Sequence, residues 1–150
     1  MKIFITGIAG FIGYHLARKL FSQGHHVLGI DSYNNYYDVS LKRSRAAKLD
    51  DLGIEVSYGD LTSTTFKSDW YNKLNDVDAV VHLAAYAGVR YSLEFPKLYI
   101  NNNIIGTQNL IEACENWNVN KVLYASTSSV MNGNPVPWDE NTKLYNQKHL

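Results

Sequence analysis

Cysteine is scarce in this sequence, and neither sign of charge is in excess. The single cysteine, Cys114, can form no disulfide within the chain, which suits a reducing compartment. Fourteen Lys and Arg residues balance fourteen Asp and Glu residues, and no basic block stands out. This balance excludes the charge pattern of a nucleic-acid or membrane-surface binder. We therefore expect a cytoplasmic protein that binds a small molecule, with Cys114 packed in its core.

Long hydrophobic runs are also absent. Residues 1–13 are mostly apolar, but glycines interrupt them early and no small-residue cleavage site follows. Their composition is typical of a buried strand rather than of a signal peptide or a membrane anchor. The chain has no internal repeat or low-complexity tract, and its 150 residues suit a single domain with a substantial core.

Five short, β-branched segments recur along the chain. Each is too short for a helix and too continuously apolar for a half-exposed strand, which predicts strands buried in a parallel sheet. The predicted strands span residues 2–6, 26–31, 54–58, 79–83 and 121–126.

Longer stretches with helical periodicity separate these strands, over residues 11–23, 39–52, 64–74 and 96–118. Strands that alternate with helices of this length form right-handed crossovers, which place helices on both faces of one twisted sheet. The predicted fold class is therefore doubly wound α/β. Residues 132–150 lack periodicity, and we divide the chain into a domain of residues 1–130 and a divergent or disordered tail of residues 131–150.

A glycine-rich turn follows the first predicted strand and opens the first predicted helix. Gly7, Gly10 and Gly13 stand at three-residue spacing, as in the turn that holds the pyrophosphate of a dinucleotide. Gly7 suits the tight turn, Gly10 leaves the backbone open to a phosphate, and Gly13 lets the helix lie close to the strand. The helix amino terminus adds free N–H groups and partial positive charge. A tight turn with incidental glycines is the alternative interpretation.

Two aspartates follow the next strands. Asp31 ends the second predicted strand, where a carboxylate accepts hydrogen bonds from the adenosine ribose and favours NAD over NADP. No arginine follows immediately to offset its charge, since residues 32–35 read Ser-Tyr-Asn-Asn. The alternative role of Asp31 is to cap a loop. Asp60 follows the third strand, where it would either bind the adenine amino group or stabilise a turn.

Five segments within residues 1–130 resemble the extended short-chain dehydrogenase/reductase family, and within it the nucleotide-sugar epimerases. The second and third segments are most similar to the UDP-glucuronate 4-epimerases. This resemblance implies a Rossmann-type sheet, NAD as the cofactor, and a carboxy-terminal substrate part that is missing here. The segments are TGIAGFIGYHL (6–16), DSYNNYYDVSLKRSR (31–45), VVHLAAYAGVRYSLEFP (80–96), NNNIIGTQNLIEAC (101–114) and LYASTSSV (123–130).

The resemblance also implies which residues hold NAD. They come from the glycine turn, from the ends of the second and third strands, from the segment after the fourth strand, and from the last helix. Small side chains after the fourth strand would allow close approach of the cofactor, with ordinary core packing as the alternative. No metal is expected. The implied cofactor-binding residues are Gly7, Gly10, Phe11, Ile12, Gly13, Asp31, Ser32, Asn35, Asp60, Leu61, Leu83, Ala84, Ala85, Tyr86 and Asn102.

Substrate contacts are implied on the other side of the cofactor. We expect Arg90 in a loop where its guanidinium meets a hexuronate carboxylate or a phosphate, with a structural salt bridge as the alternative. Thr127 would be catalytic by orienting the sugar O4, and Ser128 and Ser129 would bind the sugar. Related 4,6-dehydratases carry Asp-Glu after this threonine, so the Ser-Ser pair disfavours dehydration.

The family's reaction also uses a tyrosine base, with a lysine four residues later on the same helix face. The nearest candidate pair is Tyr145 with Lys148, three residues apart, and the alternative is that both are solvated tail residues. The resemblance ends at Met131. We therefore expect a chain that lacks the carboxy-terminal half of its relatives.

By resemblance, the complete enzyme would interconvert UDP-glucuronate and UDP-galacturonate. Hydride would pass from C4 to NAD while a tyrosinate takes the O4 proton, and it would return to the other face of the 4-keto sugar. The expected partner is a UDP-hexuronate, with a homodimer possible at full length, and neither nucleic acid nor membrane is expected. Two alternatives stay open: another NAD-dependent sugar-nucleotide epimerase or reductase, and a non-catalytic nucleotide-binding module or inactive remnant.

Overall fold

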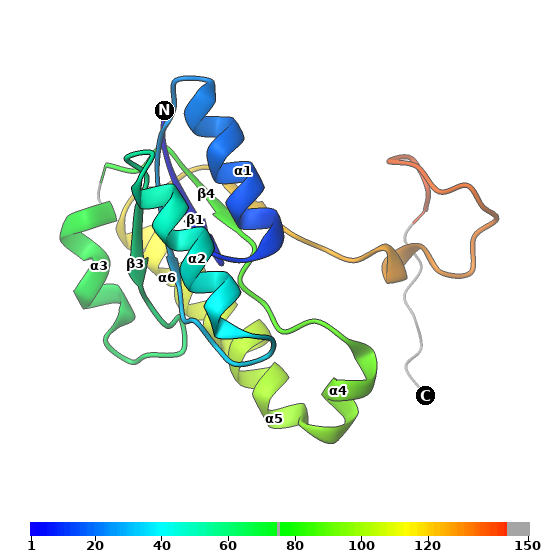
Figure 1. Ribbon diagram of the computed structural model, residues 1–150. Coiled ribbons are helices and arrows are strands. Elements are labelled where there is room, and N and C mark those ends of the chain that lie inside the picture. The colour runs from blue at the N-terminus through cyan, green and yellow to red at the C-terminus, as the bar shows by residue number, and fades with distance from the viewer. Residues whose placement is uncertain (75, 144–150) are drawn as a thin grey trace.

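One parallel sheet of five strands forms the centre of the molecule (Figure 1). The computed structural model describes residues 1–74 and 76–143. The strand order is β3-β2-β1-β4-β5, so the first strand of the chain lies in the middle. Every neighbouring pair is parallel, which confirms the predicted sheet. The strands are β1 (Lys2–Thr6), β2 (His26–Asp31), β3 (Glu55–Tyr58), β4 (Ala79–His82) and β5 (Val122–Tyr124).

Helices connect the strands and cover both faces of the sheet. Side chains of α1 and α2 pack on one face and those of α3 and α6 on the other, as the doubly wound pattern predicts. The described helices are α1 (Phe11–Ser22), α2 (Val39–Asp50), α3 (Phe66–Leu74), α4 (Val89–Glu94), α5 (Pro96–Tyr99) and α6 (Gly106–Asn116), with the π-helical η1 (Ile100–Ile105) before α6 and the 3-10 helix η2 (Ser128–Met131) after β5.

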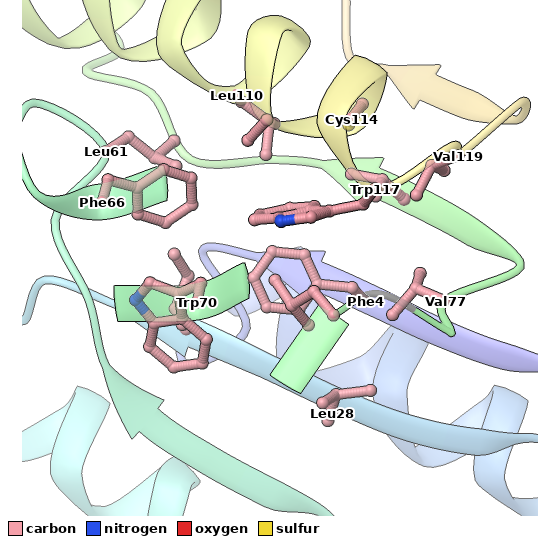
Figure 2. Close-up of a cluster of buried hydrophobic side chains, with 14 residues drawn as sticks. Phe4, Leu28, Leu61, Phe66, Trp70, Val77, Leu110, Cys114, Trp117 and Val119 are labelled. Carbon is pink, nitrogen blue, oxygen red and sulfur yellow. The ribbon is translucent and has the colours of Figure 1, made fainter. Parts of the chain in front are cut away.

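Aromatic rings fill the core between the sheet and the α3 and α6 helices. Figure 2 shows Trp117, which caps the carboxyl end of α6, above Phe4 of β1, with Phe66 and Trp70 of α3 beside them. The ring centroids of Phe66 and Trp117 are 6.0 Å apart in the edge-on geometry that aromatic pairs favour. Cys114 belongs to this cluster, and burial raises the pKa of its thiol to about 11. The prediction that Cys114 packs in the core is confirmed.

Aliphatic side chains fill the opposite face, beneath α1 and α2. Ile3 and Ile5 of β1 point to this side while Phe4 points to the other, as the two-residue period of a strand requires. They pack against Ala17 of α1 and Leu49 of α2, both fully buried. Each large apolar side chain buried in this way stabilises the fold by about 1.5–3 kcal/mol.

The segment after β4 departs from the predicted pattern in two places. Arg90 was expected in a loop but belongs to α4, because a helix of six residues is too short to show a period. The helix predicted over residues 96–118 is a succession of α5, η1 and α6. Its π-helical turn is a widening that often occurs at functional sites.

The strand β5 is shorter and more exposed than predicted. It has three residues at the edge of the sheet, where Leu123 and Tyr124 are 69% and 64% exposed. A buried strand was expected, but among the described residues only β4 pairs with it. Beyond β5 the chain leaves the sheet and forms η2 and further turns up to residue 143 (Figure 1). Within the described part of the chain, no helix has the length and apolar character needed to cross a membrane.

Candidate functional site

A cavity lies at the carboxyl ends of β1, β2, β3 and β4, the usual position of a ligand in this type of sheet. Most of the predicted cofactor-binding residues meet there. Those that line the cavity are Gly7, Gly10, Asp31, Ser32, Asp60, Leu61, Leu83, Ala84, Ala85, Tyr86 and Asn102. Residues that line it without having been predicted are Ile30, Asn34, Tyr36, Tyr37, Lys42 and Gly59.

The glycine turn forms one wall of the cavity. Gly7 has a φ of +72°, a backbone conformation that favours glycine, and its N–H donates to the Ile30 carbonyl at 2.8 Å. A Cβ on Gly7 would lie 2.9 Å from the backbone nitrogen of Ala84. A Cβ on Gly13 would lie 2.3 Å from the Gly7 carbonyl oxygen, because α1 passes directly beneath the turn. Gly10 precedes α1 without a capping side chain, so backbone alone faces the cavity there.

Four predicted residues do not line the cavity. Phe11 and Ile12, each 66% exposed, begin α1, whose first-turn N–H groups have no partner within the helix. Gly13 is buried beneath the turn and shapes the cavity from behind. Asn35 is exposed, and the residues on either side of it line the cavity in its place. Contact between these four residues and a cofactor stays a prediction.

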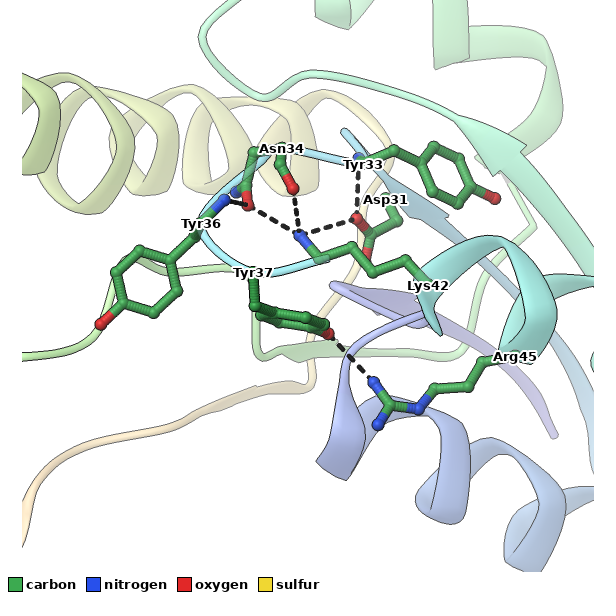
Figure 3. Close-up of polar contacts among 7 residues, drawn as sticks. All are labelled: Asp31, Tyr33, Asn34, Tyr36, Tyr37, Lys42 and Arg45. Carbon is green, nitrogen blue, oxygen red and sulfur yellow. Dashed lines mark hydrogen bonds and ion pairs between the residues drawn. The ribbon is translucent and has the colours of Figure 1, made fainter. Parts of the chain in front are cut away.

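A buried aspartate and a buried lysine face each other beside the cavity (Figure 3). One oxygen of Asp31, Oδ1, accepts the Tyr33 N–H at 2.8 Å and lies 4.0 Å from the Lys42 Nζ. The Lys42 ammonium donates to the Asn34 carbonyl at 3.0 Å and to its side-chain oxygen at 2.7 Å. Burial lowers the pKa of Lys42, and the Asp31 charge partly opposes this shift. The second oxygen of Asp31 has no hydrogen-bond partner among the described residues.

Lys42 was missed because its relation to Asp31 is not local in sequence. Residues 32–35, directly after Asp31, contain no cation, whereas Lys42 reaches Asp31 from the first turn of α2. A usable signal was present: Asp38 is a suitable N-cap, and it accepts the Ser40 N–H at 2.8 Å. A helix that begins there turns the residue at position 42 back toward the strand end.

Asp60 performs the turn role and also lines the cavity. Its Oδ1 accepts hydrogen bonds from both the backbone N–H and the hydroxyl of Thr62, each at 2.8 Å. This is the local turn that short polar side chains stabilise. Since Asp60 also belongs to the cavity wall, the two interpretations of this residue are compatible.

The buried His82, at the end of β4, belongs to a hydrogen-bond chain behind the cavity. The Thr107 hydroxyl donates to the Asn103 carbonyl at 2.8 Å, so its oxygen accepts from the His82 Nε2, 2.9 Å away. The His82 Nδ1 carries no proton in that tautomer and accepts from the Thr6 hydroxyl at 2.7 Å. The hydrogen bonds therefore define a neutral imidazole with its proton on Nε2.

The same chain joins the glycine turn to the segment after β4. The Thr6 Oγ1 accepts the N–H groups of Leu83 and Ala84, both at 3.2 Å. Further along, the Asn103 amide bonds the Tyr86 backbone on both sides, accepting its N–H at 2.8 Å and donating to its carbonyl at 2.9 Å. Asn103 thus supports the segment after β4 from behind, whereas Asn102 lines the cavity itself.

Protonation of His82 should destabilise the fold below about pH 6.5. Burial lowers the pKa of His82 from its ordinary value of 6.5, so the unfolded chain binds a proton more readily than the folded one. The stabilisation that neutral His82 gives the fold is complete above about pH 6.5. As the pH falls below this value, the free energy of unfolding decreases by up to about 1.4 kcal/mol per pH unit. Urea unfolding between pH 5 and pH 8 measures the slope. His82→Gln should flatten it, whereas the exposed His15, changed to Gln, should not; an unaltered slope in His82→Gln would refute the assignment.

The residues expected at the sugar lie outside the cavity. Arg90 is exposed on α4, a helix and not the predicted loop. Thr127 caps η2, where its Oγ1 accepts the Ser129 N–H at 3.2 Å, and Ser128 lies exposed beside them. Figure 1 shows η2 apart from α4, so the structure does not bring these groups together. Tyr145 and Lys148 lie outside the described residues.

Comparisons with known proteins agree with this geometry. A model of the NAD dependent epimerase/dehydratase family matches residues 3–149. Protein CapI of Staphylococcus aureus is 48% identical over 140 residues, which are 89% of this chain and 40% of CapI. UDP-glucuronate 4-epimerase 1 of Arabidopsis thaliana is 43% identical over 148 residues, covering 95% of this chain and 34% of the relative.

Solved structures give the same result. UDP-glucuronic acid 4-epimerase from Bacillus cereus, in complex with UDP-glucuronic acid and NAD, superposes with a TM-score of 0.77 at 36% identity. The match covers 97% of this chain and 46% of that one. The chain thus spans less than half the length of these relatives.

The extent of the family match corrects one expectation. The resemblance was expected to end at Met131, but the family model continues to residue 149. The likeness therefore includes the segment after η2, although the division into a domain and a tail stays a prediction. Matched from residue 3 to residue 149, and folded as the parallel sheet that these epimerases share, the chain belongs to the NAD dependent epimerase/dehydratase family.

Proposed function

We propose that this chain is the NAD-holding portion of a UDP-glucuronate 4-epimerase, which interconverts UDP-glucuronate and UDP-galacturonate. The observation that carries the proposal is the cavity between the glycine turn and Asp31 at the carboxyl edge of the sheet. Relatives that share this sheet are UDP-glucuronate 4-epimerases, and one of them was solved with NAD and UDP-glucuronic acid.

The residues around the cavity fit NAD in three respects. The turn presents backbone without side chains at Gly7 and Gly10, which suits close approach of a pyrophosphate. The first turn of α1 adds N–H groups that have no partner within the helix. The second oxygen of Asp31 has no partner among the described residues, although the residue is only 6% exposed, and a ribose hydroxyl would satisfy it.

Each group then has a definite task. The amino terminus of α1 would hold the pyrophosphate, Asp31 the adenosine ribose, and the second carboxylate oxygen of Asp60 the adenine amino group. Ala84 and Ala85 would leave room for the nicotinamide half. When bound, NAD supplies a reversible hydride acceptor. Lys42 would hold the Asp31 carboxylate in place through their ion pair.

The substrate and assembly are part of the same proposal. A UDP-hexuronate would lie beyond the nicotinamide, with Arg90 meeting its carboxylate or a phosphate and Thr127, Ser128 and Ser129 meeting the sugar hydroxyls. This requires the segment after β5 to approach α4 more closely than it does here. We further propose that the active protein is cytoplasmic and, at full length, homodimeric.

Calorimetric titration of the chain with NAD, followed by incubation with UDP-glucuronate, tests the proposal. We expect saturable NAD binding, and UDP-galacturonate as the product if the catalytic groups are complete. Absence of NAD binding would overturn the proposal. A product formed only from UDP-glucose would move the chain to another epimerase branch.

A non-catalytic nucleotide-binding module is the second candidate function. It is favoured by Thr127, which is exposed and does not line the cavity. It predicts NAD binding with no turnover of either sugar nucleotide, so the same experiment separates the two functions.

A further inference from the structure

A cluster of tyrosines joins two loops that border opposite parts of the cavity. Tyr36 comes from the loop between β2 and α2, next to Asp31, whereas Tyr86, Tyr91 and Tyr99 come from the segment after β4. The ring centroid of Tyr36 lies 5.7 Å from that of Tyr86 and 5.5 Å from that of Tyr91, both edge-on. Tyr86 and Tyr99 are 5.8 Å apart. Such pairs hold rings in fixed relative orientation.

Two hydroxyls of this cluster converge on one carbonyl. The Tyr36 hydroxyl donates to the Ala87 carbonyl at 2.7 Å, across 51 positions of sequence. The Tyr99 hydroxyl also bonds Ala87, and it lies 3.0 Å from the Gly88 carbonyl. The turn at residues 87–88 is therefore held from both sides. Tyr36, in the loop between β2 and α2, holds one side, and Tyr99 of α5 holds the other.

The backbone at this turn is shaped around the Tyr36 hydroxyl. Gly88 has a φ of +93°, which favours glycine, and a Cβ there would lie 2.8 Å from the Tyr36 oxygen. Gly88 is also the N-cap residue of α4, the helix that carries Arg90. The position of α4 thus depends on a contact made by Tyr36, a residue of the loop between β2 and α2.

We propose that Tyr36 is a positioning residue that couples occupation of the cavity to the placement of α4. Tyr36 lines the cavity, so a ligand that orders residues 32–37 also fixes the tyrosine hydroxyl on Ala87. The α4 helix, with Arg90, is then held in one orientation. This inference rests on the proposed function, because NAD is the ligand that fills the cavity.

Hydrogen exchange of the whole chain, with and without NAD, tests this coupling in Tyr36→Phe. The substitution keeps the ring but removes the hydroxyl, and one hydrogen bond of ordinary strength changes an opening equilibrium about fivefold. We expect NAD to slow exchange in residues 7–13 and 86–95 of the unchanged chain. In Tyr36→Phe, protection of residues 7–13 should persist, whereas protection of residues 86–95 should fall about fivefold.

Tyr37→Phe is the matched control. Tyr37 lines the same cavity, but its hydroxyl accepts from Arg45 at 3.0 Å and makes no described contact with residues 86–95. It should therefore retain the NAD effect on both segments. Equal protection of residues 86–95 in Tyr36→Phe and Tyr37→Phe would overturn the inference alone. No NAD effect on residues 7–13 in the unchanged chain would overturn the proposed function, and the inference with it.

Discussion

Replacing Gly13 with alanine should destabilise the fold by about 3 kcal/mol and abolish NAD binding. The added Cβ would lie 2.3 Å from the Gly7 carbonyl oxygen and 2.8 Å from the Ile8 Cα. Both neighbours are backbone atoms, so they cannot rotate away as a side chain would. The helix must then move off the turn that forms the cavity wall. Urea unfolding and calorimetric titration with NAD measure the two effects.

Gly106→Ala is the matched control for this substitution. Gly106 is also a helical glycine, at the start of α6, but its added Cβ would meet the Leu61 Cβ at 3.2 Å. That contact requires a small adjustment, which the higher helix propensity of alanine offsets by about 1 kcal/mol. We expect stability within about 1 kcal/mol of the unchanged chain. Equal losses of stability in the two variants would show that contact with backbone atoms at Gly13 does not cause the loss.

Asp31→Asn should weaken NAD binding about 10- to 100-fold and reduce the preference of the site for NAD over NADP. The carboxylate oxygen without a partner becomes an amide NH₂ in one orientation, which donates rather than accepts. Ribose hydroxyls then lose their acceptor, whereas a 2′-phosphate no longer meets a negative charge. Titrations with both cofactors measure the two affinities.

Lys42→Met gives the opposite change in selectivity. It removes the ammonium that lies 4.0 Å from the Asp31 Oδ1 while keeping much of the side-chain length. Asp31 then presents its full negative charge, so NADP should bind even less well relative to NAD than in the unchanged chain. If Asp31→Asn and Lys42→Met shifted the NADP-to-NAD ratio in the same direction, the charge argument would be wrong.

Features encoded by adjacent residues could be predicted from the sequence. The glycine turn, the ends of β1 and β2, and the helix that begins at Phe11 depend on residues within one short segment. Asp31 was assigned to the cavity for the same reason, since the end of a strand determines which edge of the sheet a residue reaches.

Features that depend on packing between distant segments could not be predicted in this way. Lys42 reaches Asp31 only because α2 turns back over the strand end, and Tyr36 reaches Ala87 across 51 positions. The exposure of β5 depends on what lies beside it, since its apolar residues alone are typical of a buried strand.

The strand order also determines when the middle of the sheet is completed during synthesis. Lys2 of β1 pairs with His26, but the other edge of β1 waits for β4, where Ile3 pairs with Ala79. At synthesis rates of about 5–20 residues per second, β4 follows β2 from the ribosome by roughly 2 to 10 seconds. Throughout that interval one side of β1 offers unpaired N–H and C=O groups to any neighbouring chain. The strand that is most deeply enclosed in the finished protein is thus the one whose edge stays open while the nascent chain grows.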